Sequence, residues 1–186
     1  MKPSSILVLA SMLVVSPAAA LAQDRDTAGA RAGDAALTAR VKSALTDGAQ
    51  TKGMQIQVET WNGIVQLSGF VDTVMAQEIA LKTARSVPGV REVRNDLDLR
   101  EADRSADQAA KDGVIEAKVK ALIAKDAGLA AASDVNVEVN GGIVQLSGFV
   151  PSLEEKNRAR DIAHGVRGIK DVRNNIALEE GRPEGR

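Results

Sequence analysis

Few side chains in this chain could do chemistry on a substrate. Its 186 residues include one histidine and no cysteine, so His164 has no second histidine or thiolate with which to hold a metal ion. The adjacent carboxylates Glu154 and Glu155 point to different sides of a helix, because neighbours along a helix do not face each other. An enzyme needs a nucleophile, a base and a stabilising group in one place. We therefore predict that the chain is not an enzyme and has no catalytic residue, metal site or cofactor.

Glycines form the second pattern that could carry chemistry. Residues 63–71 read GIVQLSGFV, and the same nine residues recur at 142–150, 79 positions later. A phosphate-binding loop would need a lysine after its glycines, whereas this segment alternates like a strand. Each copy supplies one glycine to a two-residue hairpin turn and one to a strand interior, where a missing side chain permits a bulge or a close approach. We interpret these glycines as structural: Gly63, Gly69, Gly142 and Gly148.

The N-terminus has the three parts of an export signal. Lys2 precedes an apolar run at 6–15, and small residues follow up to Ala22, an order typical of a cleavable secretory signal peptide. The apolar run is shorter than the ~20 residues that a membrane-spanning helix needs. We predict cleavage after Ala22 and a mature protein without a transmembrane anchor.

The repeat extends well beyond the nine identical residues. Residues 87–99 match residues 166–178 at the same offset, and the helical pattern at 37–45 matches the one at 115–123 at an offset of 78. A fixed period marks a duplicated structural unit. The predicted organisation is a signal peptide at 1–22, a flexible segment at 23–33, a first domain at 34–101, a linker at 102–111, a second domain at 112–180 and a disordered tail at 181–186.

Each unit is predicted to have the element order αββαβ. Apolar residues four apart give a first helix, with Asp34 and Asp112 expected as its N-caps in the two units. Alternating residues on either side of an Asn-Gly or Gly-Gly turn give a hairpin. A second helix follows, with Val74 and its counterpart Leu153 expected on the buried stripe, and a third strand ends the unit. The predicted fold is α+β, with a three-stranded mixed sheet and both helices on one face.

This order and two motifs resemble the BON domain family. The motifs are G-x-V-x-L-x-G at 63–69 and 142–148, followed by V-x-G-V/I-x-x-V-x-N at 87–95 and 166–174. The resemblance implies a periplasmic, non-enzymatic protein connected with osmotic or envelope stress, which contacts phospholipid surfaces or misfolded exported proteins. A lipid-anchored member of the family binds anionic phospholipid through its second domain, but this chain has no cysteine to carry such an anchor.

Apolar side chains on the open face of each sheet are the candidate partner surface. Trp61 is out of phase with the core positions of its strand, and an exposed apolar group can mark a partner or a membrane. On the second helix, Met75 and Ile79 are apolar where the second unit has Glu154 and Arg158, a charged pair. The same residues could instead pack the two domains against each other. The candidate lipid or partner surface comprises Trp61, Ile64, Phe70, Met75, Ile79, Ile143 and Phe149.

Charge excludes one class of partner and leaves two open. With 24 basic and 25 acidic residues and no basic stripe with interleaved aromatic residues, nucleic acid is not expected. The first hypothesis is protection of the envelope by peripheral association with phospholipid membrane surfaces. The alternative is a periplasmic chaperone or protein-interaction module that binds exported client proteins.

Overall fold

The computed structural model describes residues 18–47, 56–100, 105–126, 129 and 135–179. Most of the predicted signal peptide and the predicted tail at 181–186 lie outside this part. Among the described residues, no helix combines the length and the apolar character needed to cross a bilayer.

The first half of the chain forms one αββαβ domain, called domain 1 here. Its central strand β2 pairs antiparallel with β1 and parallel with β3, so the sheet is mixed as predicted. The elements are α1 (Ala18–Asp47), β1 (Ile56–Trp61), β2 (Ile64–Val71), α2 (Val74–Ser86) and β3 (Glu92–Leu99).

The second half repeats this order as domain 2. Its second and third strands are each interrupted once, which divides the sheet into β4-β5-β7 and the short parallel pair β6-β8. The elements are α3 (Ala106–Lys125), β4 (Asn136–Asn140), β5 (Ile143–Ser147), β6 (Phe149–Val150), α4 (Leu153–His164), β7 (Asp171–Asn174) and β8 (Ala177–Leu178).

Each domain has its own apolar core. In domain 1, Val41 from α1 and Ala80 from α2 pack with Leu67 from β2, and in domain 2 the equivalent Val119, Ala159 and Leu146 do the same. Both helices of a domain therefore cover the same sheet face, as predicted. Since the two clusters share no residue, the chain holds two separate interiors.

The hairpin turns are held by aspartates that we expected to be N-caps. Asn62 and Gly63 both have positive φ, as a two-residue type I′ turn requires. The backbone N–H groups of these two residues donate to Asp34 at 2.7 and 3.0 Å, and those of Gly141 and Gly142 donate to Asp112, both at 2.9 Å. The N-cap expectation was wrong, because both aspartates lie inside helices and bind the turn of the neighbouring hairpin.

The first helix of each domain begins earlier than the repeat suggested. Helix α1 runs through the segment at 23–33 that we expected to be flexible. Helix α3 starts inside the predicted linker at 102–111, where Ser105 caps it by accepting from the Gln108 N–H at 3.2 Å. The alanine-rich composition of these segments, which favours helix, accounts for the difference.

The second helix buries small residues. Ala76, Ala80 and Ala84, spaced by four, lie against the sheet of domain 1. Val74 and Leu153, which we expected on this stripe, are 54% and 59% exposed. Each is the first residue of its helix, after a capping Thr73 or Ser152, and its side chain lies beyond the covered part of the sheet.

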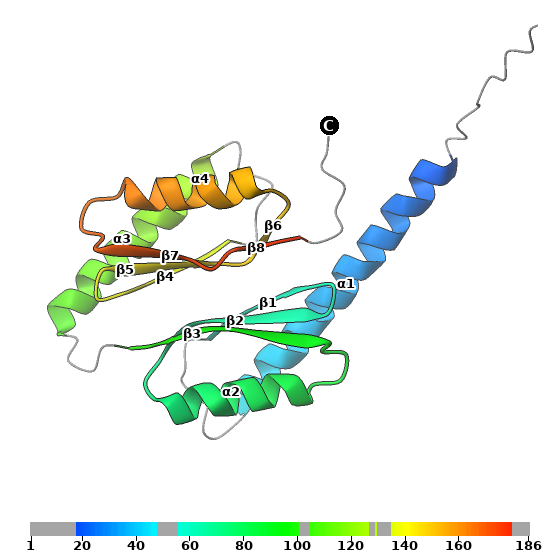
Figure 1. Ribbon diagram of the computed structural model, residues 1–186, viewed down its shortest axis with the longest axis horizontal. Coiled ribbons are helices and arrows are strands. Elements are labelled where there is room, and N and C mark those ends of the chain that lie inside the picture. The colour runs from blue at the N-terminus through cyan, green and yellow to red at the C-terminus, as the bar shows by residue number, and fades with distance from the viewer. Residues whose placement is uncertain (1–17, 48–55, 101–104, 127–128, 130–134, 180–186) are drawn as a thin grey trace, which may run out of the picture.

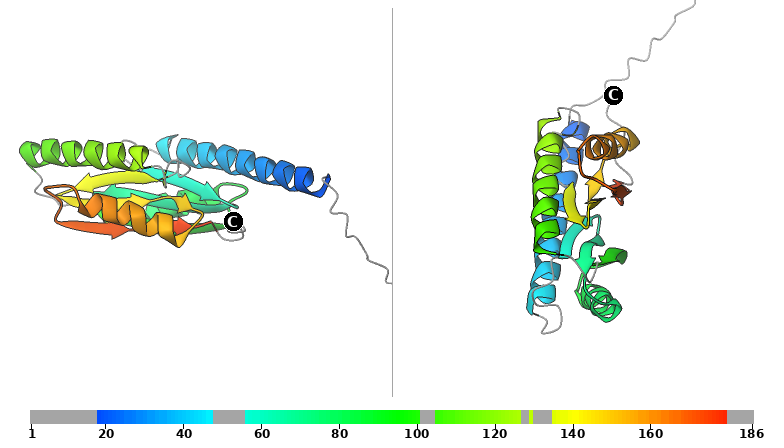
Figure 2. Two further views of the ribbon diagram at one scale, coloured as in Figure 1. Left: turned by 90° about the horizontal axis from the view of Figure 1, so that it is seen from above. Right: turned by 90° about the vertical axis from the view of Figure 1, so that its left-hand side faces the viewer.

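The two sheets face each other. Figure 1 shows them as adjacent layers, with α2 on the outer side of one and α4 on the outer side of the other. Figure 2 shows α1 and α3 along a common side of the molecule. The sheet faces that the helices leave open are therefore turned towards each other.

Candidate functional surfaces

The two glutamines of the repeated segment cross the domain interface reciprocally. Gln66 Oε1 accepts from the Gly148 N–H at 2.8 Å, and Gln145 Oε1 accepts from the Gly69 N–H at 2.6 Å. The amide of Gln66 also donates to the Asn175 carbonyl at 2.7 Å, while that of Gln145 donates to the equivalent Asp96 carbonyl at 2.7 Å. Each glutamine thus uses its acceptor and its donor on the opposite domain.

Other contacts obey the same symmetry. Ser68 and Ser147, which are equivalent in the repeat, are hydrogen-bonded to each other with their Oγ atoms 2.6 Å apart. Between the first strands of the two domains, β1 and β4, Gln57 donates to Glu138 at 2.9 Å, and Asn136 donates to Glu59 at 2.9 Å. The domains are therefore related by a local two-fold axis that passes near the two serines, as in an isologous dimer.

Charged groups complete this interface. Arg173 in β7 pairs with Asp98 in β3 at 2.6 Å. Burial raises the pKa of the Glu138 carboxyl above its ordinary value, against the opposing effect of the hydrogen bond from Gln57, and the nearby Glu116 raises it further. Glu138 therefore bears its negative charge at some cost to the folded state.

Lys156 in α4 lies close to the same interface. Its Nζ donates to the Ile176 carbonyl at 2.6 Å, and burial lowers the pKa of this amine, assisted by Arg94 and opposed by Asp96 of domain 1. In domain 1 the equivalent Gln77 donates to the Leu97 carbonyl at 2.8 Å. In both domains, the side chain at this position of the second helix donates a hydrogen bond to a backbone carbonyl near the end of the third strand.

The strand glycines serve this interface directly. Gly69 and Gly148 have φ of 111° and 122°, a region that other residues rarely adopt. This backbone conformation directs each N–H to a glutamine of the other domain. These two glycines therefore contribute to the contact between the domains as well as to their own strands.

The structure separates the predicted surface residues into three groups. Phe70 and Phe149 are only 4% and 6% exposed, so the expectation that they lie on an open face was wrong, because the second sheet covers that face. Met75 is 68% exposed. The half-buried members are Trp61, Ile64, Ile79 and Ile143.

A different apolar pair is exposed at one end of both domains. Leu99 in β3 pairs in register with Val71, three residues before Val74, and Leu178 in β8 pairs with Val150, three residues before Leu153. Val71 and Val150 are buried, but Leu99 is 51% exposed and Leu178 is 40% exposed, as Val74 and Leu153 are at the starts of the following helices. Sequence reasoning missed this exposed end because it expected Val74 and Leu153 on the buried stripe of the second helix.

Domain 1 adds a third apolar side chain to this end. Met75 follows Val74 at the start of α2 and is exposed, whereas its counterpart in domain 2 is Glu154. The apolar end of domain 1, defined as Val74, Met75 and Leu99, is therefore the less charged of the two.

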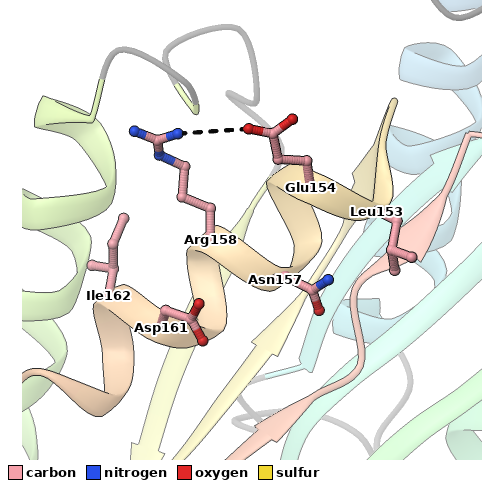
Figure 3. Close-up of a pocket in the computed structure, with 6 residues that line it drawn as sticks. All are labelled: Leu153, Glu154, Asn157, Arg158, Asp161 and Ile162. Carbon is pink, nitrogen blue, oxygen red and sulfur yellow. Dashed lines mark ion pairs between the residues drawn. The ribbon is translucent and has the colours of Figure 1, made fainter.

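The outer face of α4 has a shallow hollow of about 630 Å³. Figure 3 shows the side chains that line it projecting from successive turns of the helix, with Arg158 directed to Glu154. Arg158 lies 3.9 Å from Glu154, the predicted ion pair, and 2.7 Å from Asp126. The charge of Arg158 is therefore compensated within the protein. The lining residues are Leu153, Glu154, Asn157, Arg158, Asp161 and Ile162.

A smaller crevice of about 300 Å³ lies between the domains. It is bordered by Gln57 and Arg100 of domain 1 and by Glu116 and Glu138 of domain 2. Glu116 is paired with Lys120 at 2.6 Å, and Arg100 with Asp72 at 3.0 Å. The charged groups Glu116 and Arg100 are therefore each paired within their own domain.

Within the described part of the chain, no three His, Cys, Asp or Glu side chains are grouped as metal ligands. His164 is the last residue of α4 and is exposed. The residues that we considered for chemistry are not brought together by the fold.

Comparison with known proteins agrees with this architecture. The chain is 40% identical over 145 residues to Osmotically-inducible protein Y of Escherichia coli (strain K12), covering 77% of this chain and 71% of that protein. It is 34% identical over 156 residues to the Outer membrane lipoprotein DolP of Haemophilus influenzae, covering 83% and 79%.

A solved structure with some likeness is the C-terminal domain of CdsD, a structural protein of the type III secretion system of Chlamydia trachomatis. The TM-score is 0.31 at 16% identity, over 78% of this chain and 66% of that one, which is too low to support a conclusion. The BON domain model, in contrast, matches residues 33–101 and 111–180. The chain therefore belongs to the BON domain family and carries two copies of the domain.

Proposed function

We propose that this protein works in the periplasm, without catalysis, as an osmotic or envelope stress protein that associates with phospholipid membrane surfaces. The names of two relatives, an osmotically inducible protein and an outer membrane lipoprotein, support the cellular setting, and the signal-like N-terminus supports export. The observation that carries the membrane part is the apolar end of domain 1, where Val74, Met75 and Leu99 are all more than half exposed.

A peripheral contact of this kind needs only a few apolar side chains. Burying a methionine side chain fully contributes about 1.5–3 kcal/mol, and Met75 has most of its surface available. Insertion at the start of α2 leaves the sheet interface and both cores intact. The contact is therefore compatible with the folded two-domain protein.

Vesicle co-sedimentation tests the proposal. The purified protein is expected to sediment with phospholipid vesicles, and Met75→Ser should weaken binding by roughly tenfold, which corresponds to about 1.4 kcal/mol. Val114→Ser is the matched control, because Val114 is comparably exposed, by 53%, but belongs to α3 of domain 2 and not to the group that defines the apolar end, and it should bind as the unaltered protein does.

Two results would contradict the membrane proposal. One is equal binding by Met75→Ser and Val114→Ser. The other is no binding to either zwitterionic or anionic vesicles at low salt by a protein with an intact far-UV spectrum. If that protein also suppresses aggregation of an unfolded exported protein without lipid, the client-binding alternative is favoured. Phe70→Ala is unsuited to this assay, because a buried phenylalanine contributes to folding.

A further inference from the structure

We infer that the sheet face between the two domains also pairs domains of different chains, so that the partner of this face is a second copy of the protein. In the exchanged dimer, domain 1 of each chain packs on domain 2 of the other. The same hydrogen bonds that close a single chain are then formed between chains.

The chemistry of the interface is self-complementary. Both domains present a glutamine, a serine, a glycine N–H and a phenylalanine at equivalent places, and the glutamines exchange bonds with the opposite glycines. At the margin each domain offers one amide, Gln57 or Asn136, and one carboxylate. An isologous interface is defined by this property: the same surface is used on both sides of a two-fold axis, and its donors and acceptors pair with those of its copy.

The interface can open without disturbing either core. The two apolar clusters have no residue in common, and the central contacts of the interface are hydrogen bonds of Gln66, Ser68 and Gln145. Water can replace such bonds when the faces part, which is why each contributes only about 0.5–1.5 kcal/mol net. Of the apolar side chains there, Phe70 and Phe149 become exposed on opening.

The closed monomer and the exchanged dimer therefore differ mainly in chain connectivity. Because they are linked, the two domains of one chain have an effective concentration of the order of millimolar with respect to each other. The closed form therefore prevails in dilute solution. Exchange becomes favourable where the protein is locally concentrated.

Cysteine trapping tests this inference, because the natural chain has no cysteine. The Oγ atoms of Ser68 and Ser147 are 2.6 Å apart, so cysteines at these two positions should join as a disulfide wherever the faces meet. Ser68→Cys and Ser147→Cys are made in separate chains, mixed, incubated at increasing concentration, oxidised and separated by non-reducing electrophoresis. Exchange predicts a disulfide-linked dimer in the mixture, several-fold more than in either variant alone and rising with concentration.

Two controls decide the outcome. The double variant in one chain should form an intramolecular disulfide, which shows that the geometry permits the bond, and it should then give no dimer. Ser43→Cys, on the exposed face of α1, mixed with Ser147→Cys measures random collision.

The inference is overturned if the double variant closes but the mixture gives no dimer. It is equally overturned if the mixture gives no more dimer than the Ser43→Cys control, or no more than Ser68→Cys alone. Failure of the double variant to close would refute the serine contact itself, and the inference with it.

Discussion

Replacing Gln66 by alanine tests how strongly the reciprocal amide contacts couple the two domains. The substitution removes the acceptor of the buried Gly148 N–H and the donor to the Asn175 carbonyl. A buried donor left without a partner costs about 1–3 kcal/mol, and a lost hydrogen bond about 0.5–1.5 kcal/mol. We therefore expect the free energy of unfolding to fall by about 2–4 kcal/mol.

The loss should change the form of the unfolding transition as well as its midpoint. Trp61 is the only tryptophan and lies in domain 1, so its fluorescence follows that domain, whereas far-UV circular dichroism follows both. In urea the unaltered protein should give coincident transitions, since the domains support each other. In Gln66→Ala the two signals should separate, and each transition should have a lower m value because it exposes less surface.

Gln77→Ala is the matched control for this experiment. Gln77 donates to the Leu97 carbonyl within domain 1, so its loss should destabilise the protein and leave the two signals coincident. If Gln66→Ala keeps coincident transitions and loses less than about 1 kcal/mol, the hydrogen bonds across the interface do not couple the domains, and the reasoning from symmetry fails.

Three further predictions follow from single positions. Asp112→Ala should cost about 2–4 kcal/mol in urea unfolding, because it leaves two buried turn N–H groups unpaired; Asp34→Ala should cost clearly less, since water reaches that turn, and equal losses would contradict this account. Gly69→Ala should lower the melting temperature, because its φ of 111° costs another residue about 1–3 kcal/mol. Gly113→Ala, in a helix with open space at its Cβ, should instead gain about 0.5–1 kcal/mol, and a lower melting temperature for both would argue against the backbone explanation. Glu138→Gln should stabilise the protein at pH 7: the raised pKa of Glu138 makes its contribution to stability fall as pH rises from the ordinary value through the folded value. The gain should vanish below pH 4.5, the ordinary pKa, where the carboxyl is protonated in both states, and a gain that persists there would exclude this cause.

Much of each domain could be predicted because local signals and the repeat agreed. The Asn62-Gly63 turn, the alternation in β2 and the four-residue spacing of Val41 with its neighbours each specify a local structure. Two copies with the same pattern made accidental matches improbable. The fold class, the mixed sheet and the common helix-covered face were confirmed as a result.

The surface could not be predicted in the same way. Alternation correctly placed Phe70 opposite the core of its own domain, but a sequence pattern does not show what covers the second face of a sheet. Asp34 and Asp112 were assigned to caps because a helix start is a local feature, whereas their actual partners are about 30 residues away. Met75 was placed correctly outside the core because its own helix determines its exposure.

The domain interface also explains why nine residues are identical in the two copies. In β2, Val65, Leu67 and Val71 belong to the core, and the intervening side chains belong to the interface. Because the two copies contact each other across a two-fold axis, a change in one alters the partner of the other. Loss of Gln66, for example, leaves the N–H of Gly148 unsatisfied, although nothing in domain 2 has changed. Each copy of this segment is therefore constrained both by the core of its own domain and by the equivalent segment of the other domain. The helices do not share this second constraint, because their outer sides face solvent.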